Sequence, residues 1–92
     1  MAYIYFVSDG INVKIGTTKD LDNRILTLQT GNSNKLKLLY TIEIEDEDAF
    51  SFESFIHLMC DMFRVKNEWF NEGCIKHLQN HPWYKENMLK YR

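Results

Sequence analysis

The sequence has little of what extracellular or membrane proteins need. It contains two cysteines among 92 residues, too few for a disulfide framework, so we expect reduced thiols and a cytoplasmic setting. No apolar run approaches the roughly 18 residues of a membrane span, and the first ten residues lack the basic start and cleavage site of a secretory signal. These absences exclude a receptor ectodomain and a membrane protein. A chain this short forms one compact core, so we expect a single domain over residues 1–92 and exclude a multi-domain enzyme.

The chain also lacks the basic surplus of a dedicated nucleic-acid binder, since its net charge is −2. The charge is unevenly distributed: residues 41–53 hold six acids and no base, whereas the segments on either side each carry a surplus of two positive charges. Such an acidic block is first interpreted as a solvated loop and helix start. The alternative interpretation is a cation site, with Glu53 as its best member.

Strand-like patterns dominate the first half of the chain. The β-branched and aromatic segments Tyr3–Val7 and Val13–Gly16 flank an Asp9-Gly10 step, which predicts a hairpin. The segment Thr17–Asp20 then supplies hydroxyl and acidic side chains that can cap the start of a helix, and this helix is predicted to end at Gly31. Residues 35–45 alternate without a break, which predicts a third strand with its apolar side chains on one face.

The pattern of the second half of the chain predicts mainly helices. Acids at positions 46–48 open a longer helix that we expect to reach about Val65, with one broad apolar arc. Residues 68–70 form a short extended piece, Asn71 caps a further helix, and Pro82 suits the start of a short terminal one. The resulting order, β-β-α-β-α-(β)-α, predicts an α+β domain whose small three-stranded antiparallel sheet is flanked by helices.

Two charged residues lie at the margins of the predicted apolar stripes. Arg24 borders the stripe of the first helix, and Glu53 borders that of the long helix. Such charges are commonly snorkelling side chains or members of a rim salt bridge. The alternative is that both project into one cleft, as an anion clamp that faces a metal ligand.

Five short motifs occur in order along the chain: Tyr3-Ile4-Tyr5, Lys14-Ile15-Gly16, Arg24 with a following Leu-Gln-Thr-Gly-Asn run, Glu53 with His57 one turn later, and Glu68-Trp69-Phe70. This series resembles the GIY-YIG nuclease module, and is most similar to a branch found in phage-encoded and fungal proteins. The resemblance covers about residues 3–71 and leaves residues 72–92 as a C-terminal helical extension.

The sequence departs from that family's pattern at four positions. Tyr3 stands in place of a glycine, and Lys14 stands where many members carry tyrosine. Thr17 stands where some members carry lysine, and Leu28 where several hold histidine or tyrosine. Two polar groups that some relatives use are therefore absent.

The resemblance implies a divalent-metal-dependent DNA endonuclease that hydrolyses phosphodiester bonds. Glu53 would hold one Mg²⁺ or Mn²⁺, Arg24 would grip the phosphate, and Tyr5 would activate the water. Because a phenol is a weak base near neutral pH, we expect Lys14 to lower the pKa of Tyr5. Tyr5 as a core residue and Lys14 as an edge-strand charge stay open as alternatives. Substrate contacts are expected from Tyr3, Thr17, Lys19, His57 and Asn71.

His57 is open to three interpretations. It could order the Glu53 carboxylate, serve as a satisfied core histidine, or bind a metal. The pattern His57-x-x-Cys60 with Cys74-x-x-His77 also has the spacing of a structural zinc site, which would make the chain a zinc-stapled interaction domain. Zinc is the less favoured alternative, because free cysteines are among the most buried residues.

A second functional class stays open beside the enzyme. The missing basic surface favours a catalytically weak or inactive module that binds nucleic acid or a host protein. For the enzyme, the expected partner is DNA, with no membrane and with homodimer formation left open. The expected compartment is the cytoplasm, including that of a host cell if the protein is phage-encoded.

Overall fold

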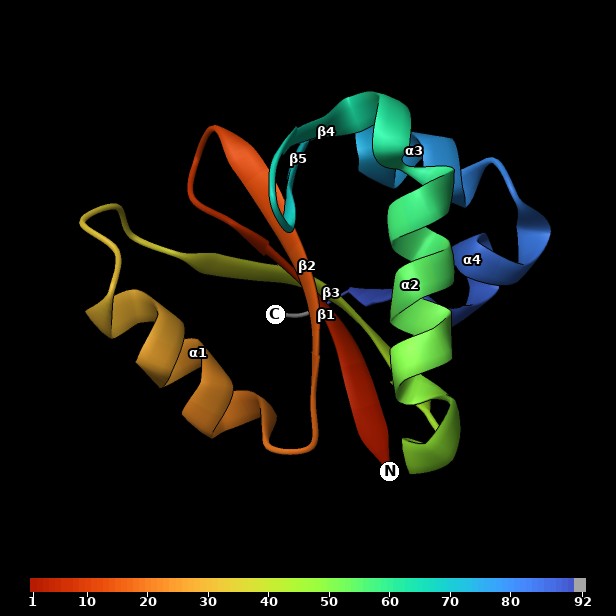
Figure 1. The fold of residues 1–92 in the computed structure, drawn as a ribbon, viewed down its shortest axis with the longest axis horizontal. Helices are drawn as coiled ribbons and strands as arrows, with labels where there is room; N and C mark the ends of the chain where they lie inside the picture. Colours follow the sequence, from red (N-terminus) through yellow and green to blue (C-terminus); the bar gives the residue numbers. More distant parts are fainter. Residues whose placement is uncertain (91–92) are drawn as a thin grey trace.

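The computed structural model describes residues 1–90 of the chain (Figure 1). Its elements follow in the order β1 (Ala2–Ser8), β2 (Asn12–Thr18), α1 (Leu21–Thr30), β3 (Lys37–Ile44), the 3-10 turn η1 (Asp46–Asp48), α2 (Ala49–Met59), the 3-10 turn η2 (Asp61–Phe63), β4 (Arg64–Lys66), β5 (Trp69–Asn71), α3 (Gly73–Gln79), α4 (Pro82–Asn87) and β6 (Leu89–Lys90).

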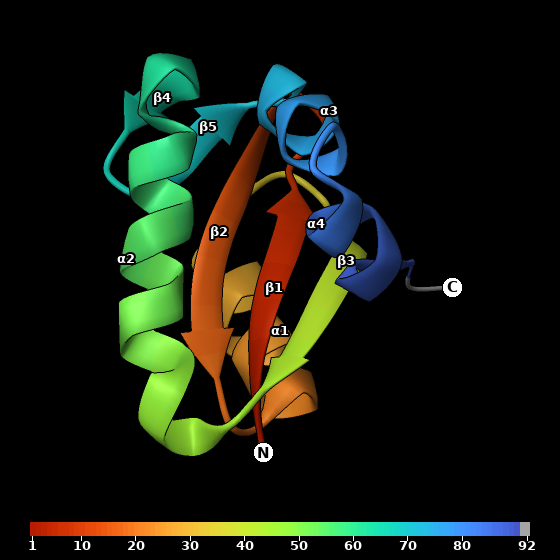
Figure 2. The ribbon, with the colours of Figure 1, turned by 90° about the vertical axis from the view of Figure 1, so that its right-hand side faces the viewer.

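One antiparallel sheet organises the fold. Within residues 1–90 it has six strands in the order β4-β5-β2-β1-β3-β6. Helix α1 covers one face, and α2, α3 and α4 cover the other (Figures 1 and 2). The structure is therefore α+β with a six-stranded sheet, and the predicted three-stranded sheet is wrong. Of the added strands, β5 overlaps the extended piece predicted over residues 68–70. β4 and β6 are three and two residues long, too short for alternation to reveal them.

Helix α2 ends earlier than its apolar pattern predicts. It stops at Met59 rather than near Val65, and after the η2 turn the backbone becomes extended at Arg64. The guanidinium of Arg64 then lies 4.9 Å from the ring centre of Phe70. This reversal lets β4 and β5 form a hairpin that joins the edge of β2.

A bulge divides the apolar side chains of β3 between the two faces of the sheet. The register against β1 shifts between Phe6 and Val7, so that Leu39 is left without a partner. Leu38 joins the cluster beneath α1, whereas Ile42 joins the cluster beneath α2. The prediction that all apolar residues of this strand face one way is therefore wrong. The bulge supplies apolar cover to both helical layers.

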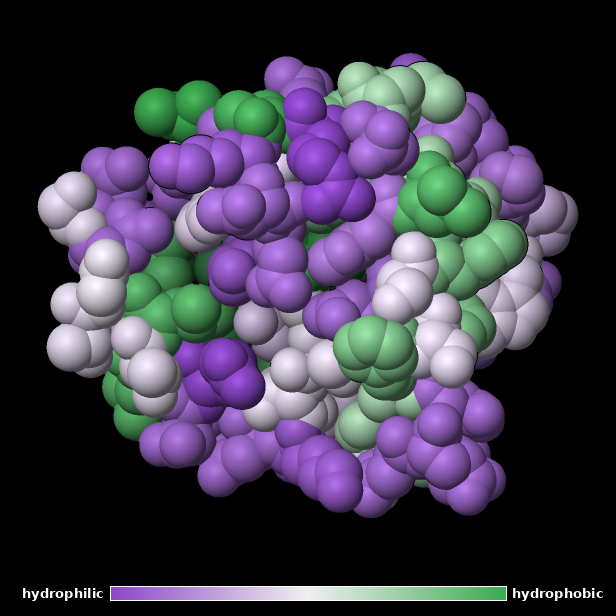
Figure 3. Space-filling view, viewed as in Figure 1, coloured by the Kyte–Doolittle hydropathy of each residue, from purple (hydrophilic) through white to green (hydrophobic). Residues whose placement is uncertain are grey.

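The edge of β2 is only partly covered by a strand. β5 pairs with β2 over three residues, Asn12 to Lys14, and beyond them α2 lies against this edge (Figure 2). No helix within residues 1–90 is long and apolar enough to cross a bilayer. The face in Figure 3 is mostly polar, with apolar side chains gathered over α2 on the right and others at the upper left and beside α1 on the left.

Candidate active site

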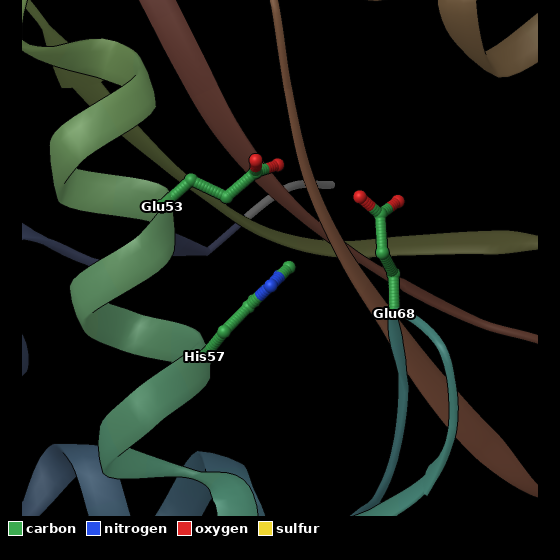
Figure 4. A group of neighbouring side chains, drawn as sticks. All are labelled: Glu53, His57 and Glu68. Atoms are coloured by element: carbon green, nitrogen blue, oxygen red, sulfur yellow. The ribbon is translucent and has the colours of Figure 1, made fainter.

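Two carboxylates and one imidazole converge beside the part of the β2 edge that no strand pairs with. Glu53 and His57 project from α2, one turn apart, and Glu68 approaches from the turn between β4 and β5 (Figure 4). One potential ligand atom from each residue lies within 4.8 Å of the other two. The turn depends on Asn67, which has a positive φ of 52°, a conformation that asparagine tolerates better than most residues. The cluster therefore joins a helix to a distant hairpin.

Ile15 of β2 holds both sides of this cluster through its backbone. Its amide donates to the carbonyl oxygen of Glu68 over 3.1 Å, and its carbonyl oxygen lies 2.9 Å from Nε2 of His57. Because a carbonyl can only accept, Nε2 must carry the proton in this bond. In the neutral ring, Nδ1 then has the free lone pair. His57 is thus half-buried, fixed by a backbone bond, and still able to offer one nitrogen.

The carboxylate of Glu53 is nearly buried and in an unfavourable charge environment. Its pKa is raised, first by burial and then by the negative charge of Glu68. The charges of His57, Lys14 and Arg24 act in the opposite direction. A bound cation would relieve both the burial and the repulsion. Two carboxylates with one imidazole suit Mn²⁺, and the carboxylate oxygens alone suit Mg²⁺, so the residues present fit the predicted metal.

Tyr5 lies in the middle of the sheet, on the face covered by α1. It pairs with Gly16 on one side and Thr41 on the other, and only 2% of it is exposed. Burial raises the pKa of Tyr5 to about 12, and the positive charge of Arg24 acts against this rise. The charges of Glu68 and Glu53 raise it further. The phenol is therefore in the electrostatic range of both carboxylates and of one cation.

The cation that acts on the pKa of Tyr5 is Arg24, whereas the predicted effect of Lys14 on that pKa stays a prediction. The Lys14 ammonium forms an ion pair with Glu68, with 3.0 Å between Nζ and Oε1. It also lies 5.7 Å from the ring centre of Trp69. Lys14 thus holds the turn that presents Glu68, a contact between residues 54 positions apart.

Arg24 approaches the same region from the opposite side, on α1. The helix begins after Asp20, whose side chain accepts a 3.2 Å bond from the backbone amide of Asn23. Arg24 is exposed, and within residues 1–90 it forms no ion pair. Its charge nevertheless acts on both Tyr5 and Glu53. A guanidinium in this position is free to bind an anionic group.

Residues 2–86 match the T5orf172 domain, and this match spans more than nine tenths of the chain. The protein belongs to the T5orf172 domain family. This phage-associated domain is often grouped with nuclease-type folds. No curated protein and no solved structure matches the sequence significantly.

The other predicted substrate contacts of this T5orf172 domain lie in different places. Tyr3 is on the same sheet face as Tyr5, two residues along β1. Thr17 is on the opposite face, and its buried hydroxyl has no hydrogen-bond partner within residues 1–90. Lys19 lies 3.5 Å from Asp46 in an ion pair.

Asn71 serves the helix that follows it. Its Oδ1 accepts a 2.9 Å bond from the amide of Gly73, at the start of α3. It pairs with Asn12, beyond the β2 residues that border the cluster. Asn71 is therefore not among the side chains that the fold brings to the cluster.

Glu68 is the functional candidate that sequence reasoning missed. From the sequence it is named only as part of the Glu68-Trp69-Phe70 motif, and it is given no role in the site. Phe70 is fully buried, whereas Glu68 stays partly exposed and points toward Glu53 (Figure 4). The missed signal is the turn formed by Asn67 and Glu68, because an acid in the turn of a short hairpin is presented at the edge of the sheet.

The predicted zinc ligands do not come together as a site. The thiols of Cys60 and Cys74 are fully buried in one apolar cluster. His57 is directed to the edge of β2, and the ring of His77 packs 5.4 Å from that of Phe63. The buried thiol pair is therefore part of the apolar core between α2 and α3.

Two surface hollows flank the sheet. One, of about 240 Å³, adjoins the site between the end of α1 and β5 and is lined by Lys14, Thr27, Leu28, Gly31, Asn32, Leu36 and Trp69. A larger groove of about 650 Å³ lies between β3 and α3, and its lining includes Lys37, Lys76 and Lys90. Neither hollow is lined by Glu53, His57 or Glu68. The smaller one adjoins their cluster through Lys14, whose ammonium is paired with Glu68.

Proposed function

We propose that this T5orf172 domain is a divalent-metal-dependent DNA endonuclease of GIY-YIG type, which hydrolyses phosphodiester bonds. One observation carries the proposal: Glu53, His57 and Glu68 converge within 4.8 Å beside the β2 edge, in the electrostatic range of a buried tyrosine. The arginine on α1 is the second element, because its charge acts on the same region from the other side. A metal ligand set, a phosphate clamp and a water-activating group are the parts that phosphodiester hydrolysis needs.

Each residue has a distinct role in this proposal. The carboxylates of Glu53 and Glu68, with Nδ1 of His57, would hold one Mg²⁺ or Mn²⁺, which supplies charge neutralisation at the scissile phosphate. Arg24 binds a non-bridging phosphate oxygen through its planar fork. Lys14 holds Glu68 in place through their 3.0 Å ion pair.

Tyr5 is the residue that orients water in this proposal. With a pKa of about 12, the phenol is protonated near neutral pH. It can therefore hydrogen-bond the attacking water, and it acts as a base only where positive charge lowers that pKa. Arg24 already provides one such charge.

A second candidate function is a nucleic-acid-binding module that does not cleave. The observation that favours it is the burial of Tyr5, which raises the pKa of the phenol and so leaves little phenolate to act as a base near neutral pH. In this alternative, Arg24 and the hollow beside Trp69 would bind a phosphate and its neighbouring nucleotide without reaction.

A cleavage assay separates the two functions. Plasmid and branched DNA are incubated with the protein in Mg²⁺, Mn²⁺ or EDTA, beside Glu53→Gln and the control Glu86→Gln, an exposed acid on α4. The nuclease proposal expects cleavage with either metal, none with EDTA or Glu53→Gln, and full activity for the control. Uncut DNA that shifts in a gel supports the binding module. A protein that neither cleaves nor binds DNA would contradict both proposed functions.

A further inference from the structure

The outer face of α2 exposes large apolar side chains to solvent. Phe50, Phe55 and Leu58 are 76%, 54% and 73% exposed, and they are followed by Met62 and Val65 at 74% and 57%. At 100° per residue, the three helical members lie on one arc, opposite the buried Ile56. We call these five residues the α2 patch. It lies on the side of the molecule where Figure 3 shows apolar side chains gathered over α2.

The α2 patch is also free of charge along the helix. The charged or titratable residues of α2 are Glu53 and His57, and both turn toward β2. The polar members of the exposed arc are Ser51 and Ser54. A helix with a solvated outer face normally carries charges there, as α1 does with Asp22 and Arg24. The composition of α2 is that of a helix covered on both sides.

The size of the α2 patch is in the range of an interface. Each side chain leaves on the order of 100 Å² uncovered, because a large side chain has about 150–250 Å² to bury. The sum, on the order of 500 Å², is at the upper end of the apolar patches that monomers expose. With a polar rim it approaches the ~800 Å² per partner of a standard-size interface.

Charges of opposite sign stand at the two ends of the α2 patch. Glu47 and Asp48 precede α2, whereas Lys66 follows η2 at the other end, beside Arg64, whose charge is paired with Asp61 over 3.0 Å. If two copies cross with their α2 helices antiparallel, the acidic end of each faces the basic end of the other. The same arrangement aligns the two helix dipoles antiparallel, which is electrostatically favourable. A surface that is complementary to itself in this way is what a two-fold dimer requires.

We propose that the α2 patch is the interface of a homodimer, in which two copies pack α2 against α2 in antiparallel orientation. Nucleic acid does not suit this face, because the apolar arc offers no cation to a phosphate backbone. Glu53 and His57 instead turn from α2 toward the edge of β2, where His57 bonds to Ile15 and both meet Glu68. Dimerisation therefore leaves both acidic clusters accessible, and the proposal stands or falls independently of the nuclease proposal.

Sedimentation across a micromolar to millimolar concentration series tests the interface. The native chain is expected to pass from monomer to dimer, and Leu58→Asp to remain monomeric with an unchanged circular dichroism spectrum. Leu26→Asp is the matched control, since Leu26 is 68% exposed on α1, and it is expected to dimerise normally. A native chain that stays monomeric throughout, or a dimer that survives Leu58→Asp, would overturn the proposal.

Exchange of the end charges tests the antiparallel orientation. In Glu47→Lys or Lys66→Glu alone, both ends of the dimer bring like charges together, which is expected to weaken self-association roughly five- to tenfold. When the two variants are mixed, each end pairs opposite charges again, so a heterodimer of native affinity is expected. Two variants that dimerise alone as well as in the mixture would overturn the antiparallel arrangement.

Discussion

The phenol ring of Tyr5 occupies the space in which a side chain at position 16 would stand. The two residues are paired across β1 and β2, and a Cβ on Gly16 would lie 2.5 Å from Cζ of Tyr5. Carbon atoms do not approach this closely without displacement. The glycine of the second tripeptide is therefore required by the tyrosine of the first, and the pair sets the position of the phenol.

Substitution of Gly16 tests this relationship. Gly16→Ala is expected to displace the Tyr5 ring, lower the free energy of unfolding by about 1–3 kcal/mol and abolish cleavage. The measurement is urea-induced unfolding, with Gly31→Ala as control, because the nearest atom to a Cβ there is 4.0 Å away. If Gly16→Ala were as stable as the control, the placement of the ring would be wrong.

The raised pKa of Glu53 predicts how the free energy of unfolding depends on pH. Its pKa is raised in the folded state, so the folded protein binds this proton more tightly than the unfolded chain does. The resulting destabilisation is absent below the unfolded pKa of about 4.3 and complete above the raised folded pKa. Glu53→Gln is therefore expected to gain stability over the native protein as pH rises through that window. Unfolding free energies at a series of pH values measure it, and a constant difference would contradict the shift.

A divalent cation is expected to stabilise the folded protein through the acidic cluster. At ten times its dissociation constant, Mg²⁺ or Mn²⁺ should add about 1.4 kcal/mol to the free energy of unfolding. Glu53→Gln and Glu68→Gln should each lose this gain, whereas Glu86→Gln keeps it. Thermal unfolding with and without metal is the measurement. Stabilisation that persists in both cluster variants would place the metal elsewhere.

Lys14 and Arg24 are expected to affect Tyr5 differently. Arg24 lowers the pKa of the phenol, which stands at about 12, so Arg24→Met should raise that pKa further. Lys14→Met should leave it nearly unchanged, because the Lys14 charge is paired with Glu68. Tyrosine ring NMR shifts followed with pH, assigned with Tyr5→Phe, measure both effects. Equal shifts in the two variants would show that Lys14 acts on Tyr5 after all.

Local signals made part of this fold predictable. The Asp9-Gly10 step and the flanking strands predicted the β1–β2 hairpin, and the caps around residues 20 and 31 predicted α1. The bulge at Leu39 and the early end of α2 could not be predicted in this way. Both depend on packing between segments that are far apart in the sequence, which single-strand or single-helix periodicity does not contain.

Only those members of the candidate site that can be recognised within a single helix or strand could be predicted from the sequence. Arg24 and Glu53 were found because each interrupts the margin of an apolar stripe, and Tyr5 because of its family motif. Glu68 was missed as a member of the candidate site because its approach to Glu53 requires α2 to end at Met59 and the chain to turn at Asn67. The pKa of Tyr5 was assigned the wrong direction, since its burial depends on the whole sheet.

The bond between Ile15 and Glu68 has a consequence for synthesis of the chain on the ribosome. The β1–β2 hairpin needs only the first eighteen residues, but its contact with Glu68 joins positions more than fifty residues apart. The hairpin and α1 can therefore form early, while the acidic cluster stays incomplete until residue 68 has left the exit tunnel. A nascent or prematurely terminated chain would carry Tyr5, Arg24 and Glu53 without the turn that closes them into a site.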